Sequence, residues 1–411
     1  MPPPSSALRR SLGALAIVLP LIGATPAPAR AQADDPLPAI KQVLASRAAA
    51  VKGGDRNAFL ATVDPQAPAA FRTAQGRLFE GLRTVPLASF DLQARIDATG
   101  DLGAGLSPKY GNARVFLPET RMVYKIAGYD ERDAVDNLWY TYVERNGRWF
   151  IASDTDLEDV GILTARGLWD FGAVQEQRSD HFIILSHPEQ AERAAALIGI
   201  AEESAATLVS RWDQPWSGRI PMVLPGSIDE LAKLLQSTFD LTKFVAFVVY
   251  QPVRDDGWST TAPRIYVQDR NLSTYGREFQ LSTLTHELDH AAVAPFAGPA
   301  IPAWVHEGVA DWVATGQSTG ERKPRGSDGL LPRDYQFTTG SGTDIVRSYG
   351  ESRSAISYLA SRFGPGAPSR FIKALGDLGP VAGSVDHNVD ATLRRLFNIS
   401  FADFQTAWAR R

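Results

Sequence analysis

Residues 281–295 read LSTLTHELDHAAVAP, and the interpretation of the whole chain starts from this stretch. Leu281, Leu284 and Leu288 recur at the spacing of one helix face, which predicts an amphipathic helix with one side left for polar residues. Pro295 cannot continue a helix, so the helix is predicted to end just before it.

Two histidines lie on this predicted helix in the pattern His286-Glu287-x-x-His290. The imidazoles are four residues apart, about one turn, so both project from one face towards a single metal ion. Glu287 can reach a water molecule on that ion without binding the ion itself. Because the chain has no Cys and only six His, any metal site must be built from His, Asp and Glu. The alternative is a solvated helix face with two His.

A second helix is predicted over PAWVHEGVADW, residues 302–312, with Gly316 as its stop. A catalytic zinc ion takes three protein ligands and leaves one position for water. Glu307 follows His290 by 17 residues and lies on a helix that can pack antiparallel to the first, so it is the predicted third ligand. Asp311 lies one turn further on, where it can accept the spare N–H of a ligand His.

Other third ligands fit the spacing less well. Asp311 in place of Glu307 stays open as an alternative. His306 points about 100° round the helix from Glu307, so we expect it to face substrate or to be structural rather than to bind metal. The metzincin extension of the motif needs a Gly and a His at positions 293 and 296. This chain has Val293 and Phe296 there, which excludes that class.

HELDH followed by PAWVHEGVADW resembles the gluzincin zinc metallopeptidases, specifically the peptidase MA-like family, whose pattern is HExxH and then P-x-W-x-x-E-G-x-A. The resemblance covers about residues 160–411 and implies a thermolysin-like catalytic domain, with a mixed sheet first and a mainly helical part after it. It also implies one zinc ion per chain. The residues that it assigns are the zinc ligands His286, His290 and Glu307, the general base Glu287 and the orienting carboxylate Asp311.

Tyr349 matches a Tyr that often opens a later helix in that family. The family's aromatic before the helix's final Gly is Phe363 here and not Tyr, which is a departure. Attack on a peptide bond creates an oxyanion that needs a donor. We expect Tyr349 to be that donor, with His306 as the reserve. A half-buried packing role for Tyr349 is the alternative.

Residues 36–155 form a separate predicted unit that begins with a helical pattern and continues as strands. Asn146-Gly147 predicts a hairpin turn. Helices followed by a sheet that closes on GRWFIASD resemble the nuclear-transport-factor-two-like cone, an α+β fold. The unit contains no His and no evident acid–base pair, so we expect a packing or binding role. The acidic residues 154–159 are predicted to be a linker. The whole chain is therefore predicted to be α+β.

Residues 1–33 have the pattern of a signal peptide: Arg9-Arg10, an apolar run and then small residues. The apolar run is shorter than the ~20 residues that span a bilayer, so no permanent membrane anchor is expected. The rest of the chain has 39 basic and 46 acidic residues, a net charge of −7, without a long Lys/Arg run. We therefore expect no nucleic-acid partner and a secreted or cell-envelope location.

These patterns predict a secreted zinc-dependent metallopeptidase that hydrolyses peptide bonds in a peptide or protein substrate. One alternative is a zinc hydrolase of a non-peptide bond, because the ligands define the reaction type better than the substrate. Another is a non-catalytic extracellular binding protein on a metallopeptidase scaffold. Degenerate scaffolds usually lose the base or a ligand, and this chain keeps all of them, which favours catalysis.

Overall fold

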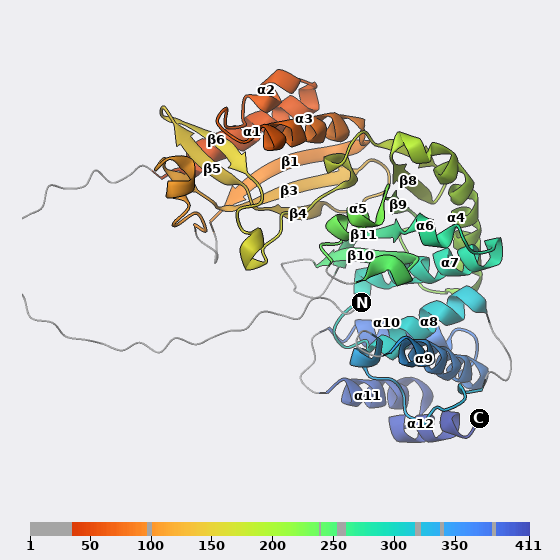
Figure 1. The fold of residues 1–411 in the computed structure, drawn as a ribbon. Coiled ribbons are helices and arrows are strands. Elements are labelled where there is room, and N and C mark those ends of the chain that lie inside the picture. The colour runs from red at the N-terminus through yellow and green to blue at the C-terminus, as the bar shows by residue number, and fades with distance from the viewer. Residues whose placement is uncertain are drawn as a thin grey trace, which may run out of the picture.

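The computed structural model describes residues 35–96, 101–237, 240–252, 260–316, 322–337, 341–379 and 384–411. The predicted signal peptide lies outside the described residues. The described chain has the predicted α+β character, with sheets in the first part and mainly helices from Arg277 onwards. Figure 1 shows the N-terminal part in red to yellow, a central sheet in green and the C-terminal helices in blue.

The N-terminal part packs helices against antiparallel strands. Its helices are α1 Leu37–Gly53, α2 Arg56–Leu60 and α3 Ala69–Thr84. Its strands are β1 Leu87–Arg95, β2 Val115–Phe116, β3 Glu119–Ile126, β4 Ala134–Leu138, β5 Thr141–Arg145 and β6 Arg148–Ser153. They pair in the orders β1-β3-β4 and β2-β5-β6. The Asn146-Gly147 turn joins β5 to β6, as predicted.

Helix α3 lies between the helical pattern and the strands of the N-terminal unit, where the sequence pattern predicts no helix. Two glycines inside it, Gly76 and Gly81, lower its intrinsic helix propensity, so the sequence pattern does not indicate a helix here. Packing requires a glycine at position 81, because a Cβ there would lie 2.1 Å from the carbonyl oxygen of Trp169. Close packing of α3 on the turn around Trp169 therefore overrides the propensity.

The central sheet has the order β10-β11-β9-β8-β7. Strands β8, β9 and β11 are parallel, and the outer strands β7 and β10 are antiparallel to their neighbours. The strands are β7 Gln175–Arg178, β8 Phe182–Ser186, β9 Ile220–Leu224, β10 Ala246–Pro252 and β11 Thr260–Val267. The helices of this part are α4 Ala191–Arg211, α5 Ile228–Leu234, α6 Asp269–Leu272 and α7 Arg277–Val293.

The C-terminal part is helical. Its helices are α8 Ala303–Thr315, α9 Gly342–Phe363, α10 Ala367–Gly376, α11 Val385–Phe397 and α12 Phe401–Ala409. Helix α8 ends at Gly316 as predicted. Helix α9 begins before the predicted start, because Ser341 and Asp344 form a capping box at its N-terminus. Tyr349 therefore lies inside α9 and does not open it.

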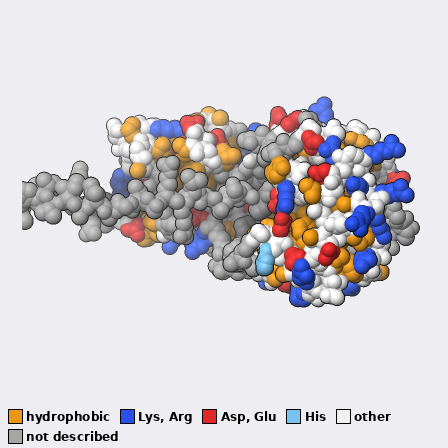
Figure 2. Space-filling view, turned by 90° about the horizontal axis from the view of Figure 1, so that it is seen from below, with side chains coloured by type: hydrophobic (Ala, Val, Ile, Leu, Met, Phe, Trp, Pro, Cys, Tyr) orange, Lys and Arg blue, Asp and Glu red, His pale blue; other side chains and the backbone are white. Residues whose placement is uncertain are grey.

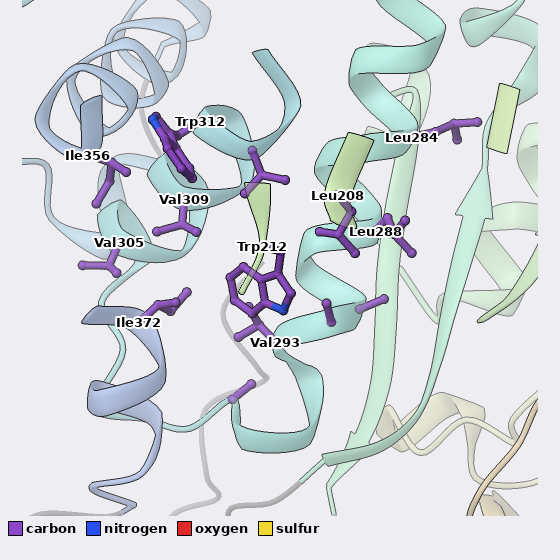
Figure 3. Close-up of a cluster of buried hydrophobic side chains, with 14 of the residues drawn as sticks. Leu208, Trp212, Leu284, Leu288, Val293, Val305, Val309, Trp312, Ile356 and Ile372 are labelled. Atoms are coloured by element: carbon purple, nitrogen blue, oxygen red, sulfur yellow. The ribbon is translucent and has the colours of Figure 1, made fainter. Parts of the chain in front are cut away.

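Both faces of the central sheet are buried. On β8, Phe182 and Ile184 join the core with α4, α7 and α8, whereas Ile183 and Leu185 join the core of the N-terminal part. This alternation follows from the two-residue period of a strand, and it explains why β8 is an unbroken apolar run. Figure 3 shows the first core, with Leu288 from α7, Val309 from α8 and other labelled side chains. The N-terminal part thus covers a sheet face that would otherwise be exposed and apolar.

A buried ion pair joins the N-terminal part to the sheet. The guanidinium of Arg264 on β11 donates to both carboxylate oxygens of Asp130, at 2.7 and 2.6 Å. The two side chains are only 7% and 1% exposed. Asp130 also accepts the backbone N–H of Ile126, so all of its charge is compensated inside the protein.

The segment predicted to be a linker takes part in this packing at Asp154 and Asp156, whereas Glu158 and Asp159 are exposed. Asp154 is buried and accepts a hydrogen bond from Arg166 at 2.7 Å. Asp156 accepts from Lys109, Tyr110 and Thr141. Acidic composition suggests an exposed connector, but here the carboxylates satisfy donors from neighbouring elements.

The Arg264–Asp130 pair predicts a large effect on stability. Arg264→Met keeps most of the side-chain volume but leaves Asp130 buried without its counter-charge, so the free energy of unfolding should fall by about 3–5 kcal/mol. Urea unfolding measures this change. Arg178→Met is the matched control, because Arg178 pairs with Glu176 at the surface and such pairs contribute little. Equal stability of both variants would contradict the role of the buried pair.

Candidate metal centre

The close approach of α8 to α9 depends on Gly308. A Cβ at this position would lie 2.6 Å from the carbonyl oxygen of Ser352 and 2.8 Å from a side-chain carbon of Ile356, both on α9. Only glycine allows the two helices to pack at this distance. Glu307, the residue before Gly308, is consequently fixed beside α9, the helix that carries Tyr349.

Helices α7 and α8 bring together the three predicted metal ligands. His286 Nε2 and His290 Nε2 lie 3.0 Å apart. Glu307 Oε2 lies 3.2 Å from the first of these nitrogens and 3.4 Å from the second. Ligand atoms at ~2.0–2.1 Å from a tetrahedral zinc ion are roughly 3.3 Å apart, so the three atoms match one face of such a tetrahedron. The group could hold a metal ion, and its donor atoms are those that zinc accepts.

Asp311 lies behind His286. Its Oδ1 accepts the Nδ1–H of His286 at 2.9 Å. With the proton held on Nδ1, the lone pair of Nε2 faces the metal group, and this is the usual way in which a carboxylate orients a ligand His. The carboxylate in the metal group is that of Glu307. The geometry therefore favours Glu307 over Asp311 as the third ligand.

Burial and charge act in opposition at this group. Burial opposes protonation of His286, but Asp311 and Glu307 outweigh it and raise its pKa well above the usual value. Burial favours protonation of Glu307, but His290 and His286 outweigh it and hold the pKa of Glu307 well below its usual value. Without a metal ion, a proton on His286 therefore balances the Glu307 carboxylate. A cation that binds here must displace that proton.

Glu287 lies next to the metal group, but its carboxylate is not bonded to that group. Its side chain is 9% exposed, and within the described residues no hydrogen bond or ion pair engages its carboxylate. Burial raises its pKa, partly offset by the two imidazoles. A carboxylate with a raised pKa and free lone pairs can accept a proton in a reaction.

Tyr349 reaches the same group from α9. Its ring lies 6.3 Å from the ring of His286, and Glu307 is close enough to act on the pKa of its hydroxyl. Burial and then the negative charges nearby raise the pKa of Tyr349 well above its usual value, so the hydroxyl keeps its proton. Tyr349 is therefore a hydrogen-bond donor beside the metal group.

His306 lies on the far side of His290 from the metal group. Its Nδ1 is 2.7 Å from Nδ1 of His290, whose Nε2 faces the metal group. Burial lowers the pKa of His306 to about 3, so the ring is neutral. This position fits the predicted structural role and does not place His306 where an oxyanion donor is needed.

Tyr250 is a further tyrosine close to Glu307, and no motif in the sequence marks it. Ala246, Val248 and Tyr250 alternate along β10, and Val248 and Tyr250 pack on the core that contains α7. Burial and the charge of Glu307 raise the pKa of Tyr250. The alternation along the strand is a signal in the sequence, but it does not reveal that β10 runs beside the metal group.

Asp289 is a second residue that the motif does not reveal, because the x positions of HExxH are unrestricted. Its side chain is fully buried, and neither carboxylate oxygen has a hydrogen-bond partner in the described part of the chain. Burial raises the pKa of Asp289 to about 7. The described residues give no structural reason for a carboxyl group at this position.

A small cavity lies inside the N-terminal part. Its volume of about 20 Å³, among Arg47, Tyr140 and Asp170, is space for about one water molecule. Arg47 is 1% exposed and donates to Thr62 Oγ1 at 2.9 Å. These contacts favour the packing role expected for this part.

Comparison of the chain with protein-family models, with curated proteins and with solved structures finds no match. The site is therefore interpreted from its own geometry. Within the described residues, no helix combines the length and the apolar character that crossing a membrane requires.

The geometry predicts a graded loss of metal affinity. Glu307→Ala removes a ligand and should weaken Zn²⁺ binding by more than the ~10–100-fold expected for Asp311→Asn, which removes an orienting partner. His387→Ala, at an exposed His on α11, is the control and should bind like the wild type. Competition with a chromophoric chelator measures all the affinities. Wild-type affinity in Glu307→Ala would show that the ion binds elsewhere.

Proposed function

We propose that the chain is an exported zinc-dependent peptidase with a thermolysin-like, gluzincin-type catalytic part. The observation that carries this proposal is the triangle of His286 Nε2, His290 Nε2 and Glu307 Oε2, with sides of 3.0 to 3.4 Å. The unengaged carboxylate of Glu287 lies beside that triangle. Two imidazoles and one carboxylate with an open fourth position are a donor set used by zinc hydrolases.

A zinc ion held by these residues would activate a water molecule and polarise the scissile carbonyl. Glu287 accepts the proton as the water attacks and then delivers it to the leaving amine. Its raised pKa brings it closer to the operating pH, which suits a group that must both take up and release a proton. Asp311 keeps His286 oriented during this exchange.

Tyr349 is the proposed donor to the oxyanion. Its hydroxyl remains protonated and lies near the carboxylates of the site. A donor that is fixed before the reaction needs no reorganisation as negative charge develops. Helix α9 supplies this rigidity, because Gly308 lets it pack tightly on α8.

The sheet supports a peptide as the substrate. Strand β10 is an outer strand of the sheet, is paired with β11 and packs beside α7. The open edge of a strand can pair with an extended peptide through main-chain hydrogen bonds. Such pairing would lay a peptide along β10, next to the helix that carries Glu287.

The net charge of −7 on residues 34–411, which contain no long Lys/Arg run, supports a substrate that is not a nucleic acid. Figure 2 shows Lys and Arg side chains among Asp and Glu side chains on the described part of one face. A nucleic-acid surface gathers Lys and Arg on one side. The nuclear-transport-factor-two-like identity of the N-terminal part, and the removal of a signal peptide, belong to the same proposal.

Glu287→Gln tests the proposed base. The substitution keeps the size of the side chain but removes the proton acceptor, so we expect peptidase activity to fall by about 10²–10⁴-fold with Zn²⁺ still bound. Cleavage of a peptide library by the zinc-loaded protein measures activity. Glu278→Gln, at an exposed position in the first turn of α7, is the control and should keep full activity.

The library also separates the proposal from its alternatives. A wild-type protein that binds zinc but cleaves no peptide would favour a zinc hydrolase of another bond or a binding scaffold. Full activity in Glu287→Gln would exclude this residue as the base.

Tyr349→Phe tests the oxyanion donor. Loss of the hydroxyl should lower kcat about 10²–10³-fold with little change in KM, because the interaction forms only in the transition state. Tyr275→Phe, at an exposed tyrosine before α7, serves as the matched control. An unchanged kcat in Tyr349→Phe would assign this residue to packing alone.

A further inference from the structure

We propose that His306 is a positioning residue that holds the imidazole of His290 in its metal-binding orientation. The inference rests on the proposed zinc site. It begins from one contact, the 2.7 Å between Nδ1 of His306 and Nδ1 of His290. The two rings lie 4.7 Å apart between their centroids and are tilted by 40°, so the contact is edge to edge and not a stack.

The contact fixes which nitrogen of each ring carries a proton. A hydrogen bond between two imidazole nitrogens needs one N–H donor and one lone-pair acceptor. His290 directs Nε2 to the metal group, where a ligand needs a free lone pair, so the proton of His290 sits on Nδ1. His290 therefore donates, and Nδ1 of His306 accepts.

This assignment leaves the remaining proton of His306 on its other ring nitrogen. If Nδ1 accepts, the neutral ring carries its proton on Nε2. This Nε2 atom is buried and has no hydrogen-bond partner among the described residues. An apolar side chain would avoid the free-energy cost of that unpaired N–H. The lone pair of Nδ1, which accepts the hydrogen bond from His290, therefore explains why this residue is a His.

A neutral acceptor also suits the charge of the site. Three carboxylates, Glu287, Glu307 and Asp311, already lie at the metal group. A further carboxylate behind His290 would add negative charge beside the proposed base. His306 orients the ring without adding that charge. Helix α8 thus supplies one ligand, Glu307, and an orienting group behind each ligand His.

Zinc affinity tests the proposal in the full chain. His306→Phe keeps a planar ring without an acceptor and should weaken Zn²⁺ binding by about 10–100-fold. His306→Asn places an amide oxygen near the position of Nδ1 and should restore most of the affinity. His387→Phe, at an exposed His, is the control. Circular dichroism shows whether each variant is folded, and the visible absorption of bound Co²⁺ reports a distorted ligand geometry in His306→Phe.

The outcomes separate this proposal from the proposed function. Wild-type affinity and an unchanged Co²⁺ spectrum in His306→Phe would overturn the role of His306 and leave the zinc site intact. Equal losses in folded His306→Phe and His306→Asn would also overturn it, since the ring volume and not the acceptor would then matter. A wild-type protein that binds neither Zn²⁺ nor Co²⁺ would overturn the metal centre itself, and this proposal with it.

Discussion

The candidate site depends on one buried contact, in which the Glu307 carboxylate meets the imidazoles of His286 and His290. A buried carboxylate must be compensated, and a proton on His286 does this when no metal is bound. The same contact holds three ligand atoms at the spacing of a tetrahedral face. Two residues support this contact. Asp311 orients His286, and Gly308 lets α8 pack on α9. The fold thus holds the three ligand atoms in position before a cation binds.

The metal group also depends on the parts of the chain that lie far from it. Helix α7 packs on one face of the central sheet, and the other face is covered by the N-terminal part. Ile183 and Leu185 of β8 belong to the N-terminal core, and the pair of Arg264 with Asp130 crosses the same boundary. The boundary predicted near residues 155–160 therefore does not coincide with the boundary between the two cores, because strand residues that follow it belong to the N-terminal core. The N-terminal part supports the sheet on which the site is built, whatever else it binds.

Much of this arrangement could be predicted from the sequence where the signal is local. The His286 and His290 spacing, the cap at Gly316 and the Asn146-Gly147 turn each depend on a few neighbouring residues. Helix α3 was missed because Gly81 is required by a contact with Trp169, which is distant in the sequence. Tyr250 and the contact of His306 with His290 were missed for a related reason. Both depend on which elements become neighbours in space, and a single sequence does not record this.

The proposed site and its chemistry both require that a single zinc ion binds to two imidazole nitrogens and one carboxylate oxygen. X-ray absorption at the zinc edge of the zinc-loaded full chain tests this claim most directly. We expect one zinc per chain in a four-coordinate shell of nitrogen and oxygen at about 2.0–2.1 Å. The spectrum should show the multiple scattering of two imidazoles, and this signal should disappear in a variant that lacks His286 and His290. A protein that takes up no zinc, or a shell without imidazole, would contradict the claim.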